Sequence, residues 1–164
     1  MGELASDPAM PSANGDVSGY TLETLNMMAG EFNQRIGMKL TEVAPERVVG
    51  TVPVEGNRQP YGLLHGGVNA ALGETLGSIA AAINAGPTRA AMGLELSCTH
   101  HRAARAGLVT GVCTPLHIGN TVSTFETVIT DEQGRRTCTV RLTCLLRDRP
   151  PGGDPLTDGY ATPR

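Results

Sequence analysis

Residues 66–84 read GGVNAALGETLGSIAAAIN, and this stretch decides the fold of the 164-residue chain. Its large apolar side chains recur every three or four residues, which is the spacing of one face of an α-helix. They are Val68, Leu72, Leu76, Ile79 and Ile83. The spacing predicts a single long helix with one face in a core.

The opposite face of this predicted helix carries very small residues around Glu74, the only ionisable side chain in the stretch. The small residues are Gly67, Ala70, Gly77 and Ala81. A helix face in contact with water normally carries several charges. We therefore expect another chain, a ligand or both to cover the face around Glu74.

After the helix, the apolar residues alternate with a period of two, which is the pattern of β-strands. In the first such segment one face comprises Leu94, Leu96, Cys98 and His100, and the other comprises Glu95, Ser97, Thr99 and His101. Further strands are predicted over Gly107–Ile118, Thr121–Thr130 and Arg136–Leu146, with a turn at 131–134 between the last two.

Before the long helix, we expect a short helix at Thr21–Met28 and two extended segments at Lys39–Ala44 and Arg47–Val54. An extended pair, one long helix and then a run of strands is typical of an α+β fold. In this arrangement an antiparallel sheet wraps around the long central helix.

Both ends of the chain are rich in Ser, Pro, Gly and Asp, so we expect disordered tails at 1–19 and 147–164 around one folded domain at 20–146. The net charge is -3, and the chain contains no run of Lys or Arg, which argues against a nucleic-acid partner. No secretory signal or bilayer-spanning stretch is recognisable, which predicts a cytoplasmic protein with no membrane partner. The four cysteines lack C-x-x-C spacing and lie in apolar segments, as buried thiols in a reducing compartment do.

Glu74 is the first candidate for chemistry, because a carboxylate held away from water is a stronger base and a better nucleophile. A structural role fits its position equally well, since buried acids are often paired with an arginine such as Arg58 or Arg102. Just before the helix, residues 64–67 (LHGG) place N–H groups at a helix N-terminus, where they can polarise a carbonyl oxygen. The alternative for this segment is a tight loop capped by His65.

Other side chains carry a weaker signal. Gln59 can place an amide near the start of the helix, and Ser78 lies one turn beyond Glu74, where it either orients water or substrate or only packs. His100 continues the apolar face of its strand and His101 points the other way, so the two cannot bind one metal. With no cysteine at ligand spacing, we expect no metal site. The common nucleotide, dinucleotide and serine-hydrolase motifs are absent, which leaves the helix to supply the chemistry.

Two stretches, 57–67 (NRQPYGLLHGG) and 72–78 (LGETLGS), strongly resemble the hotdog-fold acyl-CoA thioesterases of the PaaI-like group. Motifs at 99–102 (THHR), 111–113 (GVC), 115–117 (PLH) and 131–136 (DEQGRR) resemble in particular the branch with the proofreading thioesterase of enterobactin biosynthesis and the 1,4-dihydroxy-2-naphthoyl-CoA and 4-hydroxybenzoyl-CoA thioesterases. The similarity extends from about Phe32 to Leu146, with the motifs in order. It implies a hotdog fold and thioester hydrolysis without a cofactor.

The resemblance also implies a role for each matching residue. Glu74 is then the catalytic carboxylate, which attacks the thioester or activates water. The Gly66 amide and Gln59 engage the thioester carbonyl and its surroundings, and His65 supports their loop. Ser78 then helps to position water or the acyl group, and His100 lines the acyl pocket. Arg102 is a further candidate, for contact with the coenzyme A phosphates.

Three functions follow from this resemblance. The first is hydrolysis of an aromatic acyl-CoA, hydroxybenzoyl-like or naphthoyl-like, and the second is proofreading of misacylated acyl or aryl carrier proteins. The third, non-catalytic acyl-CoA binding, is disfavoured because binding alone needs no desolvated carboxylate such as Glu74. Relatives often have an arginine where this chain has Asn120, which bears on the choice between coenzyme A and carrier-protein thioesters.

A distance along the helix predicts the quaternary structure. Eight residues separate Gly66 from Glu74, or about 12 Å at about 1.5 Å per residue, so one thioester carbon cannot contact both. An antiparallel second helix packed through Ala70, Gly77 and Ala81 brings the Gly66 end of one subunit beside Glu74 of the other. We therefore expect a homodimer with shared sites, and the resemblance implies pairing into a homotetramer.

Overall fold

The computed structural model describes residues 21–27 and 29–149. The expected tail at 1–19 and most of the expected tail at 147–164 lie outside these residues. The last strand runs to Asp148, two residues beyond its predicted end at Leu146, and Asp148 pairs with Arg89. Residues 147 and 148 therefore belong to the sheet and not to a tail.

Three helices form in the described part of the chain: α1 (Leu22–Met27), α2 (Gly30–Arg35) and α3 (Gly66–Ala85). The helix α3 confirms the predicted long helix. It ends where Gly86 adopts a left-handed φ of 76° and its N–H donates to the Ala82 and Ile83 carbonyls. None of these helices has the length and apolar character needed to cross a membrane.

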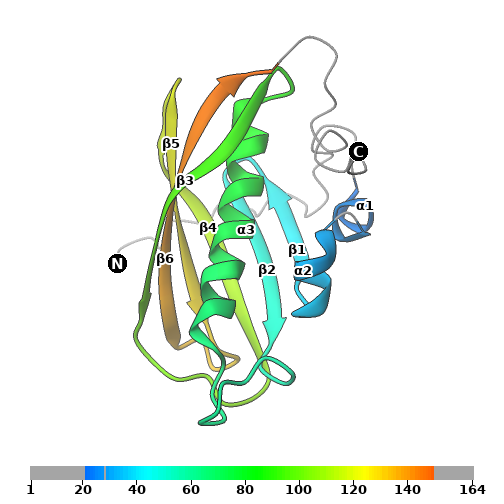
Figure 1. The fold of residues 1–164 in the computed structure, drawn as a ribbon, viewed down its shortest axis with the longest axis vertical. Coiled ribbons are helices and arrows are strands. Elements are labelled where there is room, and N and C mark those ends of the chain that lie inside the picture. The colour runs from blue at the N-terminus through cyan, green and yellow to red at the C-terminus, as the bar shows by residue number, and fades with distance from the viewer. Residues whose placement is uncertain (1–20, 28, 150–164) are drawn as a thin grey trace, which may run out of the picture.

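Six strands form one antiparallel sheet in the order β1-β2-β4-β5-β6-β3. Their bounds are β1 (Lys39–Ala44), β2 (Arg47–Pro53), β3 (Arg89–His100), β4 (Leu108–Ile118), β5 (Val122–Thr130) and β6 (Arg136–Asp148). The predicted strands and the turn at 131–134 are confirmed, and the Gly134 N–H closes that turn on the Asp131 carbonyl. Figure 1 shows the sheet curving around α3, with α1 and α2 beside β1. This is the expected α+β hotdog arrangement.

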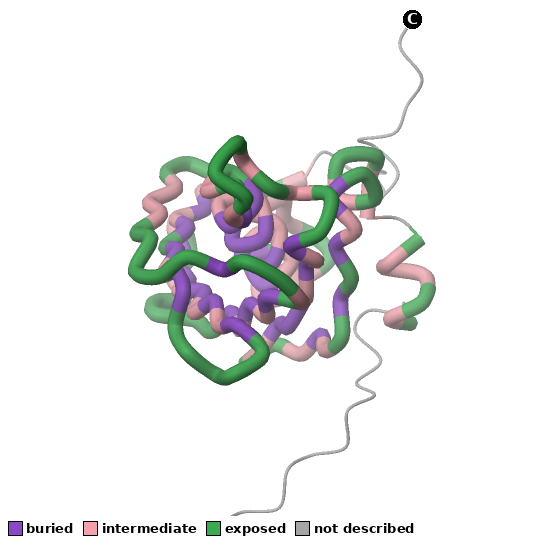
Figure 2. The backbone as a smooth tube through the Cα atoms, turned by 90° about the horizontal axis from the view of Figure 1, so that it is seen from below, coloured by how far each residue is buried: buried purple, intermediate pink, exposed green. Residues whose placement is uncertain are grey.

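The core lies between α3 and the sheet, and Figure 2 shows the buried segments gathered inside a shell of exposed loops. Leu72 and Leu76 of α3 are fully buried there, against side chains from four strands. These are Val48, Val52, Val109, Phe125, Ile129, Val140 and Leu142. Burial of each such side chain stabilises the fold by about 1.5–3 kcal/mol relative to exposure.

The small residues of α3 do not all lie where the sequence predicted. Gly77 and Ala81 were expected to face a second helix, but both are buried against the sheet of their own chain. A Cβ on Gly77 would lie 2.7 Å from Leu142 Cδ2, and one on Gly73 would lie 2.4 Å from Val140 Cγ1. These glycines let the helix approach β6 closely. The outward side of α3 instead carries Gly67, Ala70, Glu74, Ser78 and Ala82.

The strand β3 is an edge of the sheet and contains an irregularity. Gly93 pairs with Cys144 and Glu95 with Thr143, so Leu94 is an extra residue at a bulge. Leu94 is 62% exposed, and the predicted alternation from Leu94 to His100 therefore fails at its first residue. The free edge of β3 presents this leucine to solvent.

Candidate active site

The loop before α3 holds the helix N-terminus in place. His65 is the N-cap, and its Nδ1 accepts a hydrogen bond of 2.9 Å from the Gly67 N–H. The His65 N–H donates to the Asn57 carbonyl, and the Asn57 side chain donates to the carbonyls of Ile36 and Pro53. No hydrogen-bond partner of the Gly66 N–H is present among the described residues. That amide is thus available to a ligand.

Gln59 lies on the same loop, in a tight turn. Its backbone N–H donates to the Leu63 carbonyl, and the Gly62 N–H donates back to the Gln59 carbonyl. The side-chain Oε1 accepts from the Tyr61 N–H at 2.8 Å, which fixes the amide group and leaves its Nε2 donors unused by these contacts. The structure therefore places an amide donor on the loop that presents Gly66.

Glu74 lies two turns further along α3 and is half-buried. The Ser78 hydroxyl is 3.5 Å from its Oε1, as the predicted spacing of one turn requires. A Cβ on Gly93 of β3 would lie only 2.6 Å from the same oxygen. The missing side chain of Gly93 thus provides the space in which the carboxylate lies.

The structure does not support the alternative in which an arginine neutralises Glu74. Within residues 21–27 and 29–149, no ion pair includes this carboxylate. Arg58 pairs with Glu55 at 2.8 Å and donates to the Arg105 carbonyl. A half-buried carboxylate without a cation, beside a hydroxyl and a glycine, is suited to act on a ligand.

His100 turns toward the start of α3, as the strand alternation predicted. Its ring is so close to Gly66 that a Cβ there would lie 2.8 Å from His100 Nε2. The Asn69 amide nitrogen is 3.3 Å from His100 Nδ1. His101 points to the other face of the sheet, where its Nε2 lies 2.8 Å from the Thr139 hydroxyl.

The cysteines are free thiols, three of them buried and Cys98 half-buried. Burial raises the pKa of Cys113 to about 11, and burial together with the neighbouring Cys98 raises the pKa of Cys138 to about 12. Two cysteines lie close to His100 in space, although none stands at the sequence spacing typical of a metal site. Cys98 Sγ is 3.6 Å from His100 Nε2, and Cys138 comes from the paired strand β6.

Arg102 is exposed and lies apart from Glu74, on the loop after β3. It lines a polar surface cavity of about 520 Å³ together with the loop that follows it and the β5–β6 turn. In that turn Asp131 accepts hydrogen bonds from Arg135, which lower the pKa of its carboxyl group. Arg102 and Arg105 line this cavity beside the Asp131–Arg135 ion pair and the carboxylate of Glu132.

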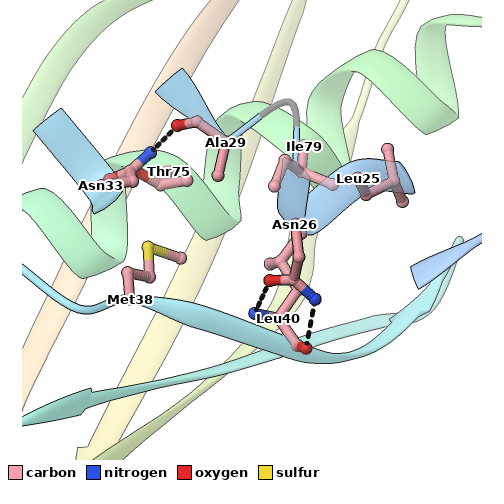
Figure 3. Close-up of a pocket in the computed structure, with 8 residues that line it drawn as sticks. All are labelled: Leu25, Asn26, Ala29, Asn33, Met38, Leu40, Thr75 and Ile79. Carbon is pink, nitrogen blue, oxygen red and sulfur yellow. Dashed lines mark hydrogen bonds between the residues drawn. The ribbon is translucent and has the colours of Figure 1, made fainter. Parts of the chain in front are cut away.

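An apolar cavity of about 150 Å³ lies between α3, β1 and the two short helices α1 and α2 (Figure 3). It is lined by Leu25, Asn26, Ala29, Asn33, Met38, Leu40, Thr75 and Ile79. Asn26 closes one side, because its amide exchanges hydrogen bonds with the backbone of Leu40. This cavity was not predicted because it depends on α2, which the sequence analysis missed, and Glu74 is not among its lining residues.

Within one chain, the candidate groups form two separate sets. Gly66, His65 and His100 gather at the N-terminus of α3, and Glu74 with Ser78 lies eight or more residues along the same helix, about 12 Å away. An amide without a hydrogen-bond partner at a helix N-terminus and a carboxylate without a cation partner among the described residues are groups that acyl transfer to water can use. A sheet wrapped around one helix with these groups defines a hydrolase of the hotdog class.

Comparisons with known proteins identify the family. The thioesterase superfamily matches residues 61–138. The proofreading thioesterase EntH of Cronobacter turicensis is 46% identical over 128 residues, which span 77% of this chain and 93% of that protein. The chain belongs to the thioesterase superfamily, a class of thioester hydrolases.

Solved structures agree with this assignment. A thioesterase of Haemophilus influenzae superposes with a TM-score of 0.75 at 31% identity, over 79% of this chain and 92% of that one. A variant thioesterase of Pseudomonas aeruginosa gives a TM-score of 0.74 at 30% identity, over 80% of this chain and 96% of that one. The hotdog fold and the PaaI-like resemblance read from the sequence are thereby confirmed.

Proposed function

We propose that this protein hydrolyses an aromatic acyl-CoA, hydroxybenzoyl-like or naphthoyl-like, with Glu74 as the catalytic carboxylate. The observation that carries this proposal is the half-buried Glu74, which has no cation partner among the described residues and lies 3.5 Å from Ser78. Glu74 either attacks the thioester carbonyl carbon or removes a proton from the water that attacks it. When water attacks, Glu74 takes its proton, the carbonyl π electrons move to oxygen and return as the C–S bond breaks, and the thiolate leaves with that proton. When Glu74 attacks, the same loss of thiolate leaves a mixed anhydride on Glu74, which water then hydrolyses to the acid and the free carboxylate.

The developing oxyanion needs a donor, and the Gly66 N–H is the candidate. Because about 12 Å separates Gly66 from Glu74 within one chain, we propose that each site combines Glu74 with the partner subunit's Gly66. The free edge of β3, with Met92 46% and Leu94 62% exposed, supports association along this side of the molecule. Dimer formation here also covers the outward side of α3. A tetramer would pair two such dimers.

The remaining predicted residues bind the substrate in this proposal. Gln59 and His65 hold the loop that presents the carbonyl-binding amide, Ser78 orients the attacking water or the acyl group, and His100 lines the acyl pocket. Arg102, on the surface cavity, contacts the phosphates of coenzyme A. We expect the small outward residues of α3 to leave a flat slot beside Glu74, which would suit an aromatic ring better than a long alkyl chain.

A second function is favoured by one comparison, the 46% identity to a protein named proofreading thioesterase. In that case the substrate is a misacylated carrier protein, and the chemistry at Glu74 is unchanged. The surface beside Arg102 would then face the carrier protein's phosphopantetheine attachment site. Asn120 is exposed after β4 and offers no charge to a nucleotide phosphate.

The test is a hydrolysis screen with released thiol as the readout. It compares benzoyl, hydroxybenzoyl, phenylacetyl and aliphatic CoA thioesters with an aroyl carrier protein. Glu74→Ala and Glu74→Gln are expected to lower turnover at least about a hundredfold while the protein stays folded. Near-normal hydrolysis by either folded variant would overturn the role of Glu74, and a larger loss in Ser78→Ala would reverse the two roles.

A further inference from the structure

Two thiols and an imidazole meet at one point on the inner side of β3 and β6. Antiparallel pairing sets His100 opposite Cys138 and Cys98 opposite Val140, so the three side chains lie on neighbouring positions of one face. Cys98 Sγ is 3.3 Å from Cys138 Sγ and 3.6 Å from His100 Nε2. All three atoms lie within 4.8 Å of one another.

The two separations that involve Cys98 are close to those in a tetrahedral metal site. With metal–sulfur bonds of about 2.3 Å and metal–nitrogen bonds of about 2.0–2.1 Å, two sulfur ligands lie about 3.8 Å apart, and a sulfur and a nitrogen about 3.6 Å apart. The observed Cys98–His100 separation equals the second value, and the two sulfur atoms need to part by only about 0.5 Å. Two thiolates and one imidazole are a ligand set typical of zinc.

A second observation comes from Asn69, which is 5% exposed and packs behind His100. Its Oδ1 is the one buried side-chain polar atom without a hydrogen-bond partner in the described residues. A half-turn of the amide places this oxygen about 3.3 Å from His100 Nδ1. The Nδ1–H then donates to Asn69, and Nε2, which is 3.6 Å from Cys98 Sγ, is left with a free lone pair. Metal-binding histidines are commonly fixed by such a second hydrogen bond.

We propose that Cys98, Cys138 and His100 form a three-ligand site for a soft cation such as Zn²⁺, with Asn69 as the positioning residue behind the histidine. His100 is exposed and Cys98 half-buried, so the ion reaches the site from solvent and keeps its fourth position open to water. An ion on Nε2 of His100 also competes with the acyl group. That consequence rests on the proposed function, whereas the binding of the ion does not.

The experiment titrates the reduced full-length protein with Co²⁺ as a spectroscopic probe and then displaces it with Zn²⁺. We expect one equivalent per chain, a thiolate-to-cobalt charge-transfer band, and loss of the band on addition of Zn²⁺. Cys98→Ala removes a ligand and should abolish the band, whereas Cys113→Ala removes a buried thiol on β4 and should leave it intact. Asn69→Ala should weaken Zn²⁺ binding about 10- to 100-fold.

The possible results are decisive in either direction. A wild-type protein without a charge-transfer band, or a band of equal strength in Cys98→Ala, would overturn the site. Loss of the band in a folded Cys113→Ala variant would show that Cys113 is a ligand, and this result would also overturn the proposed site. None of these readouts depends on hydrolysis, so they hold whether or not Glu74 is the catalytic group.

Discussion

Gly93→Ala should slow thioester hydrolysis without unfolding the protein. The new Cβ would lie 2.6 Å from Glu74 Oε1, whereas ordinary contact begins at 3.4 Å, so the carboxylate must move by about 0.8 Å. A displacement of about 1 Å from the reacting position costs about 100-fold in rate. We therefore expect kcat/KM to fall roughly 10- to 100-fold, which is about 1.4 to 2.7 kcal/mol of activation free energy.

The fold itself should tolerate this substitution. The atom displaced is the end of a flexible side chain, and Gly93 is not among the glycines with positive φ. Replacement of a strand glycine by alanine even favours the folded state by about 0.5–1 kcal/mol. The assay is thioester hydrolysis beside thermal unfolding, and its control is the same substitution in a Glu74→Ala background. If Gly93→Ala lowers the residual hydrolysis rate of Glu74→Ala by the same factor, its effect does not depend on displacement of the Glu74 carboxylate, and the reasoning is refuted.

Three further predictions concern stability and substrate choice. Gly77→Ala places a Cβ 2.7 Å from Leu142 and should lower the free energy of unfolding by about 1–3 kcal/mol, measured by denaturant titration. An unchanged free energy of unfolding would mean that α3 does not approach β6 this closely. Burial holds the pKa of Cys113 at about 11 against 9.0 for an ordinary thiol, so its contribution to stability is complete below pH 9 and is lost as the pH rises toward 11. Thermal unfolding at pH 8 and pH 10 checks this, and Cys113→Ala should lose less stability over that interval than the wild type. Hydroxybenzoyl-CoA should turn over faster than palmitoyl-CoA, and the reverse order would contradict the flat slot beside Glu74.

The sequence predicts the elements of this fold well because its periods are clear. Buried Leu72 and Leu76 recur at helical spacing, and β5 and β6 alternate almost without interruption. The helix α2 was missed because Phe32 is its only large apolar side chain, so no helical period can emerge, whereas α1, of the same length, has Leu22 and Leu25 three residues apart. The bulge at Leu94 was missed because one extra residue shifts the alternation without any change in composition.

Two features could not be predicted from sequence periodicity: which face of α3 packs on the sheet, and the cluster formed by Cys98, Cys138 and His100. Glycine has no side chain to mark a face, so only the close approach of β6 shows that Gly77 is an inward residue. Cys98 and Cys138 are 40 positions apart, and strand register alone brings them together. For the proposed active site, the sequence identified Glu74 and its spacing to Ser78, whereas the absence of an arginine partner among the described residues required the structure.

The central claim is that Glu74 acts with the partner subunit's carbonyl-binding loop, and subunit mixing tests it most directly. Glu74→Ala subunits and Gln59→Ala/His65→Ala subunits, each nearly inactive alone, are dissociated, mixed in equal amounts and reassembled. A mixed dimer then holds one site with every defect and one wild-type site. Because random pairing makes half of the dimers mixed, about a quarter of wild-type activity should return. Verified subunit exchange with no recovered activity would contradict the shared site and require Glu74 to act with groups of its own chain.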